Sequence, residues 1–282
     1  LPLSGQPHAA AARLLLIDNS PAWLGKAFEM LGSKGNVEFF LLEKKGSSYA
    51  TLADTVGKNV ADHVISANTV HLIPDIGETF RGIAAALKDN GIFILQSGNI
   101  PRHGTPKGAL MVDDTVKRVH DIALEIVRTD ARFEKYRKNL NERISATESQ
   151  RKFVFPDTRL IEFYLDALKK TGFSYEEPHF KLFKVKYDDW LRFLRVRRLQ
   201  AGILPEIGGN EPTTKEETDR DTLITLATNK LFKELQSKNP LADKESFTLE
   251  IVYVKARKVR KEQQLLLKGK KALVTGASRG IG

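Results

Sequence analysis

The sequence contains no cysteine, and only two methionines and two tryptophans occur among its 282 residues. The lack of cysteine excludes disulfides, thiolate zinc sites and cysteine nucleophiles. No stretch approaches the roughly 18 apolar residues of a membrane span. The first residues, LPLSGQPHAAAA, lack the basic segment and apolar core of a secretory signal. We therefore expect a cytoplasmic protein that has no membrane partner.

Acidic residues are outnumbered, since 45 Lys and Arg face 35 Asp and Glu and give a formal net charge of +10. Such a charge raises the possibility of nucleic-acid binding. The basic residues, however, gather in 181–198, where they alternate with apolar residues, and in 255–271. An amphipathic helix and a solvated linker account for these two stretches, so nucleic acid is a disfavoured partner.

The first hundred residues alternate strand and helix patterns. Apolar runs at 13–17, 36–42, 61–67 and 91–96 predict strands, and they are separated by predicted helices at 22–31, around 49–57 and at 76–87. This alternation is typical of a parallel sheet that is covered on both faces. We expect an α/β, Rossmann-like and mostly parallel sheet with helices on both faces.

The pattern changes after residue 100. A helical insert is expected over 101–157, with its helical part at 113–144. The predicted elements that follow are a helix at 159–171, a strand at 179–185, a helix at 188–201, a polar loop at 208–217, a helix at 221–236 and a last strand at 247–256. One domain should thus span 1–256, followed by a basic linker at 257–269 and a new strand at 270–275.

Polar residues follow three of the predicted strands. Asp18 and Glu43 end the first two, and Asn68 and His71 come after the third. Ligands of open α/β sheets bind at the carboxyl ends of the strands, where an acid commonly accepts ribose hydroxyls. A helix cap for Asp18, a plain surface position for Glu43 and a hydrogen-bonded structural role for His71 remain the alternatives.

Four segments in order, RLLLIDNSPAWLGKAFEML, NVEFFLLEKKG, ADHVISANTVHLIPD and FRGIAAALKDNGIFILQSGNI, resemble the class I S-adenosylmethionine-dependent methyltransferases that act on small molecules. The resemblance is close over 13–100 and looser over 159–185 and 247–256. It implies an antiparallel last strand beside the strand at 179–185, with S-adenosylmethionine as cofactor. The cofactor-binding residues that it implies are Asp18 for the ribose, the adjacent Asn19, Glu43 for the adenine, and Ala67 and Asn68 on the methionine side.

The sequence departs from the pattern of this family at its start. The family's first strand and glycine-rich loop should precede residue 13, where only Gly5 occurs. We therefore expect a chain that is truncated at its start. Methyl transfer requires a general base only for an acceptor that must lose a proton, and His71 or His103 would be that base. Acceptor specificity should come from the insert at 101–157 and from the aromatic, basic segment 187–204.

The last residues, KKALVTGASRGIG, place a glycine-rich loop directly after an apolar strand. They resemble the start of the short-chain dehydrogenase/reductases, in particular the beta-ketoacyl reductases. The implied NADP(H) site comprises Thr275, Gly276, Ser278, Arg279, Gly280, Ile281 and Gly282. The expected parent is a bifunctional enzyme, truncated here at its end as well, in which the reductase part could drive oligomerisation.

Three functions stay open on the sequence. The favoured one is methyl transfer to a small-molecule acceptor in a fusion with the reductase. The second is an inactive methyltransferase-like scaffold or binding module that serves the reductase. A nucleic-acid methyltransferase is third, because Asn68-Thr69-Val70-His71 does not match the Asn-Pro-Pro-Tyr turn typical of enzymes that methylate base nitrogens.

Overall fold

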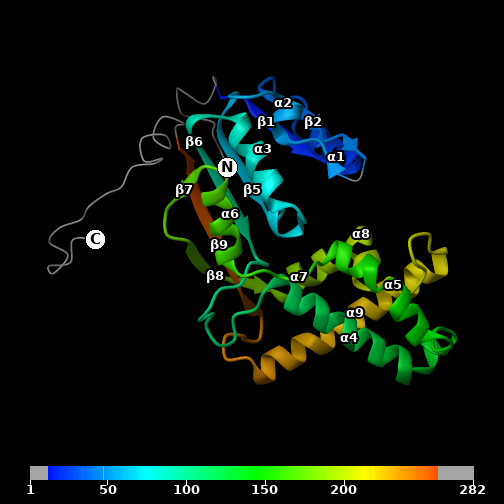
Figure 1. The fold of residues 1–282 in the computed structure, drawn as a ribbon. Coiled ribbons are helices and arrows are strands. Elements are labelled where there is room, and N and C mark those ends of the chain that lie inside the picture. Colours follow the sequence, from blue (N-terminus) through cyan, green and yellow to red (C-terminus); the bar gives the residue numbers. More distant parts are fainter. Residues whose placement is uncertain (1–11, 47, 260–282) are drawn as a thin grey trace, which may run out of the picture.

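The computed structural model describes residues 12–46 and 48–259 (Figure 1). Its strands are β1 (Leu14–Asp18), β2 (Val37–Leu41), β3 (Lys44–Lys45), β4 (Ser48–Tyr49), β5 (Ala61–Ala67), β6 (Leu87–Ser97), β7 (Phe173–Tyr175), β8 (His179–Lys186) and β9 (Ser246–Lys258). Its α-helices are α1 (Pro21–Leu31), α2 (Leu52–Val56), α3 (Ile76–Ala86), α4 (Val112–Thr129), α5 (Leu140–Val154), α6 (Ile161–Lys170), α7 (Tyr187–Leu194), α8 (Arg197–Ile203) and α9 (Thr214–Lys238). Two short 3-10 helices are η2 (Val70–Leu72) and η3 (Ala131–Tyr136).

Two groups of strands carry the α/β part. β1 and β2 form a parallel pair that is joined through α1. A second sheet has the order β5-β6-β9-β7, with β8 also paired to β9. β5 and β6 are parallel, whereas β9 runs antiparallel to β6, β7 and β8. The Rossmann-like α/β class is confirmed, as is the antiparallel pairing of the last strand with β8. The sheet has more antiparallel pairing than we expected, because β9 pairs with three strands.

The long strand β9 connects two hydrophobic cores. Its first half places Phe247 and Leu249 in a core formed mainly by α4, α7 and α9. Its second half places Val252 and Val254 in a core with α3, α6 and β6. Figure 1 shows β9 running from the helices in the lower part of the view up through the sheet. The helical insert therefore packs on the α/β part through a shared strand.

The helical region, which comprises α4, η3, α5, α7, α8 and α9, is interrupted at points that the sequence did not indicate. The segment 113–144, which was expected to be mostly helical, comprises α4, η3 and the start of α5, with Asn139 in the left-handed region at φ 55° before α5. The predicted helix at 188–201 divides into α7 and α8. α9 begins earlier than expected, since Thr213 forms a capping box with Glu216 inside the predicted polar loop.

The end of the domain lies slightly beyond the predicted boundary. Arg257 pairs with Ile92 in β6, and Lys258 pairs with Phe173 in β7. The prediction of a basic linker from residue 257 was wrong for these two residues, because they belong to β9 and pair with its neighbouring strands. The rest of that linker from residue 260 and the predicted strand at 270–275 lie outside the described residues.

Among the described residues, none of the helices combines the length and the apolar character that crossing a membrane would require.

Candidate active site

The carboxyl end of β1 brings Asp18 and Ser20 together. The Oδ1 atom of Asp18 accepts the backbone N–H of Ser20 at 2.7 Å, and Asn19 lies exposed between them. Ser20 is the N-cap residue of α1, but its side chain makes no capping hydrogen bond. One oxygen of Asp18 thus orders the turn into the helix, as the structural alternative predicted. In the described part of the chain, Oδ2 makes no hydrogen bond, so it can accept a ligand hydroxyl.

Glu43 lies close in the chain to the end of β2, the partner strand of β1. Asp18 is paired with Leu41, two residues before Glu43. The side chain of Glu43 is exposed, and its carbonyl accepts the Ala50 N–H at 2.8 Å, which closes the β3–β4 hairpin. The residues that the resemblance assigns to ribose and adenine therefore follow two neighbouring parallel strands.

Asn68 ties together the ends of β5 and β6. Its backbone adopts the left-handed region at φ 51°, which asparagine tolerates better than most residues. The side-chain Oδ1 accepts the Gly98 N–H at 3.0 Å, and the Asn68 N–H donates to the Gln96 carbonyl at 2.8 Å. Ala67 precedes it at the exposed end of β5. This part of the candidate site is held by backbone contacts between the two strands.

His71 lies in η2, directly after that strand end, and both of its ring nitrogens are occupied. The Asp113 N–H donates to Asn99 Oδ1 at 2.8 Å and thereby fixes the orientation of the Asn99 amide. The Asn99 Nδ2 then lies 3.2 Å from His71 Nε2. The other ring nitrogen of His71, Nδ1, lies 2.9 Å from Ser97 Oγ. Because an amide nitrogen only donates, Nε2 must accept and Nδ1 must carry the proton.

Burial lowers the pKa of His71 to about 4, so the ring is neutral near physiological pH. With both nitrogens bound to Ser97 and Asn99, no lone pair of the ring faces outward. This geometry suits the structural alternative for His71, and its assignment as a base stays a prediction. His103 is exposed in the loop after β6 and does not join this cluster. The neighbouring Arg102 and Thr105 both donate to Glu250, so they anchor this part of the loop to β9.

Asp113 belongs to the same cluster and was missed by the sequence analysis. It lies in the first turn of α4 with 1% exposure, and neither carboxyl oxygen makes a hydrogen bond. Burial raises its pKa to about 6, against the opposing effect of the Lys117 charge. No sequence pattern indicates this burial, because an acid in the first turn of a charged helix usually faces solvent.

A second missed residue is Arg198 of α8. Its Nη1 donates to Ser20 Oγ at 3.0 Å and so connects the helical region with the carboxyl end of β1. The sequence had marked 187–204 for acceptor specificity without choosing a residue. No choice was possible, because the break between α7 and α8 decides which side each arginine occupies.

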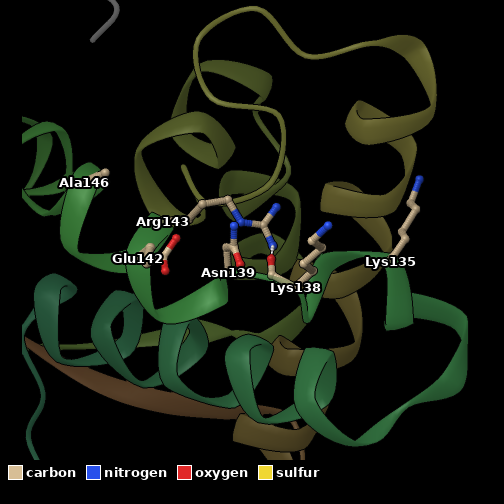
Figure 2. Close-up of a pocket in the computed structure, with 6 residues that line it drawn as sticks. All are labelled: Lys135, Lys138, Asn139, Glu142, Arg143 and Ala146. Atoms are coloured by element: carbon tan, nitrogen blue, oxygen red, sulfur yellow. Dashed lines mark hydrogen bonds between the residues drawn. The ribbon is translucent and has the colours of Figure 1, made fainter.

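A shallow hollow of about 430 Å³ lies elsewhere, on the helical region (Figure 2). It is lined by Lys135, Lys138, Asn139, Glu142, Arg143 and Ala146. Lys135 pairs with Asp219 at 3.0 Å, and Arg143 donates to the Lys138 carbonyl at 3.3 Å. All its lining residues come from η3, α5 and the turn between them, so it does not belong to the strand-end site.

The predicted NADP(H) residues, Thr275, Gly276, Ser278, Arg279, Gly280, Ile281 and Gly282, lie outside the described residues.

No protein-family model matches the sequence. No curated protein matches it either. Among solved structures, the chain is similar to the YcgJ protein from Bacillus subtilis, with 14% identity, coverage of 90% of this chain and 88% of that one, and a TM-score of 0.45. A Bacillus halodurans protein whose methyltransferase activity is itself only proposed shows 16% identity, 90% and 87% coverage, and a TM-score of 0.44.

A third similar structure is the phosphoethanolamine N-methyltransferase 2 from Haemonchus contortus, in complex with S-adenosyl-L-methionine. The identity is 16%, the alignment covers 90% of this chain and 45% of that one, and the TM-score is 0.42.

Proposed function

We propose that this chain is an S-adenosylmethionine-dependent methyltransferase that acts on a small-molecule acceptor. The observation that carries the proposal is Asp18, a partly buried carboxylate at the carboxyl end of a parallel strand with its Oδ2 free to accept a hydroxyl. The sequence segments that resemble the class I enzymes place the ribose at this same residue. Glu43 follows the partner strand and offers a second acceptor for an adenine amine.

The residues of the site would mainly bind and orient the reactants in this reaction. When bound, the cofactor supplies a methyl group on a sulfonium, which is already an activated leaving group. Asp18 and Glu43 would fix the nucleoside end, and Asn68 would hold the ends of β5 and β6 beside the methionine end. Precise alignment of acceptor, methyl carbon and sulfur then supplies most of the acceleration. The helical region would exclude water from the acceptor.

The reductase fusion and its NADP(H) site are part of the proposal on sequence grounds alone. They rest on KKALVTGASRGIG, in which an apolar strand leads directly into a glycine-rich loop. A cytoplasmic location is also proposed on sequence grounds, and the reductase part is the segment that could drive oligomerisation of the parent.

The first experiment is calorimetric titration of the full natural polypeptide with S-adenosylhomocysteine. The Asp18→Ala variant should bind about 1–3 kcal/mol more weakly, because ribose hydroxyls lose a charged acceptor. Asp62→Ala is the matched control. Asp62 is also a carboxylate in a parallel strand, but it lies near the start of β5 and pairs with Lys88 on the surface at 2.9 Å.

Equal affinities for Asp18→Ala and the parent would return Asp18 to the role of a turn residue. A parent protein that fails to bind S-adenosylhomocysteine would contradict the methyltransferase proposal. That result would favour the alternative of an inactive binding module.

A further inference from the structure

Four arginines follow one another on α7, at its C-cap and at the start of α8, and three of them are paired with carboxylates. Arg192 lies 3.5 Å from Asp189, Arg195 lies 2.7 Å from Asp221, and Arg197 lies 3.6 Å from Glu217. Within residues 12–46 and 48–259, the fourth, Arg198, has no carboxylate partner. Its one hydrogen bond there is to the neutral Ser20 hydroxyl.

Arg198 also differs from the other three arginines in its position. Ser20 is separated from it by 178 residues and stands at the carboxyl end of β1, where the Ser20 N–H donates to Asp18. Ser20 has 8% exposure, whereas Arg198 is exposed. Figure 1 shows α8 on the side of the helical region that faces α1. The guanidinium therefore binds a residue two positions after Asp18, which we assign to the cofactor, and it reaches that strand end from the helical region.

A guanidinium has five N–H donors in a planar fork. The Ser20 hydroxyl accepts from one nitrogen, and the fork retains donors for a second partner. The groups that match such a fork best are carboxylates and phosphates, which accept two parallel hydrogen bonds and neutralise the charge.

We propose that Arg198 binds an anionic group, a carboxylate or a phosphate, on the methyl acceptor. This inference rests on the proposed function, since the acceptor is the ligand that remains once the nucleoside is assigned to Asp18 and Glu43. It gives the acceptor a chemical class, a small acid. It also gives the helical region a specific task, which is to select that acid beside the carboxyl end of β1.

The test uses the full natural polypeptide saturated with S-adenosylhomocysteine, and inorganic phosphate and acetate as anion probes. The readout is the change in the backbone amide resonance of Ser20 as each anion is added. Arg198→Gln should weaken the response to the better-bound anion by about tenfold or more, because a charged bidentate contact is lost. Arg197→Gln is the matched control, since Arg197 is the adjacent residue on α8 but pairs with Glu217.

Two further measurements keep the inference falsifiable. Arg198→Lys keeps the charge without the fork and should bind the anion with intermediate affinity, even if Arg198→Gln does not fold. Equal anion responses in the Arg198 and Arg197 variants would overturn the proposal. It would also be overturned if Arg198→Gln weakened S-adenosylhomocysteine binding and left the anion response unchanged. A parent that binds no S-adenosylhomocysteine refutes the proposed function, whereas titration of the unsaturated protein still shows whether Arg198 binds an anion.

Discussion

The β1–α1–β2 unit and the β6–β9 region contain similarly apolar sequences but differ sharply in burial. None of the residues of α1 is buried, and Phe28 and Met30 on that helix are 60% and 79% exposed. In β6 and β9, by contrast, Phe93, Leu95 and Val254 are at most 1% exposed. The difference follows from neighbours: β6 has a paired strand on each side, whereas β1 in the described residues pairs with β2 alone. An apolar run predicts a strand, but its burial depends on what lies beside it.

The largest expected difference between the two regions is in the cost of removing a phenylalanine. Phe93→Ala should lower the free energy of unfolding by about 3–5 kcal/mol, since it empties a fully buried site next to Phe80 and Phe173. Phe39→Ala in the half-buried strand β2 should lower it by about 1–2 kcal/mol. Urea unfolding at one pH measures both. Equal losses would show that the β1–α1–β2 unit is as well packed as β6 and β9.

A smaller effect is expected at Asp113, whose buried carboxyl should make the folded state less stable when it ionises. The Asp113 carboxyl has its pKa raised from 3.8 to about 6 by burial, so the folded state favours the protonated form. Stability should therefore fall as pH rises from about 4 to about 6 and remain lower above that range. Asp113→Asn cannot ionise and should be more stable than the parent by about 1–3 kcal/mol at pH 7.5, with little difference at pH 4.

The control for this variant is Asp121→Asn, which changes an acid on the same helix with a side chain 63% exposed. Unfolding in urea at both pH values gives the comparison. The contrary outcome is a difference in free energy of unfolding between Asp113→Asn and the parent that is the same at pH 7.5 and at pH 4. That result would show that the folded protein accommodates the Asp113 carboxyl in its ionised form.

The smallest effect is expected in the exposed β1–β2 pair. Arg13 donates to Glu38 across the two strands, with side-chain exposures of 71% and 42%. Because water screens such a pair, a double-mutant cycle with Arg13→Ala and Glu38→Ala should give a coupling energy of about 0–1 kcal/mol that decreases with added salt. A coupling well above that range would mean that the pair is shielded from solvent.

Much of the α/β part could be predicted from the sequence, and the side-chain site could not. The strands near 13–17, 61–67 and 91–96 were recognisable because apolar runs of that length end at polar turn residues. The same pattern located Asp18 and Asn68 at strand ends. It could not show that the Asn99 amide engages His71, since that contact depends on how the loop after β6 meets α4.

The helical region was harder to predict for a related reason. Its helices were recognisable, but their breaks at Asn139 and between α7 and α8 depend on local backbone geometry and on packing. Arg198 and its three neighbours are alike in sequence, and only the fold separates the one beside Ser20 from those paired with acids. A contact over 178 residues leaves no local pattern from which it could be predicted.

The shared strand β9 has a consequence for folding cooperativity. Phe247 and Leu249 belong to the core of the helical region, and Val252 and Val254 to the core of the sheet, with only two residues between the sets. Separating the helices from the sheet would remove the hydrogen-bond partners of the backbone at one end of β9. It would also expose apolar side chains in the middle of that strand. The helical region and the sheet should therefore melt in one transition, and amide hydrogens along β9 should exchange through global opening rather than local fraying. The two cores form a single folding unit because one strand belongs to both.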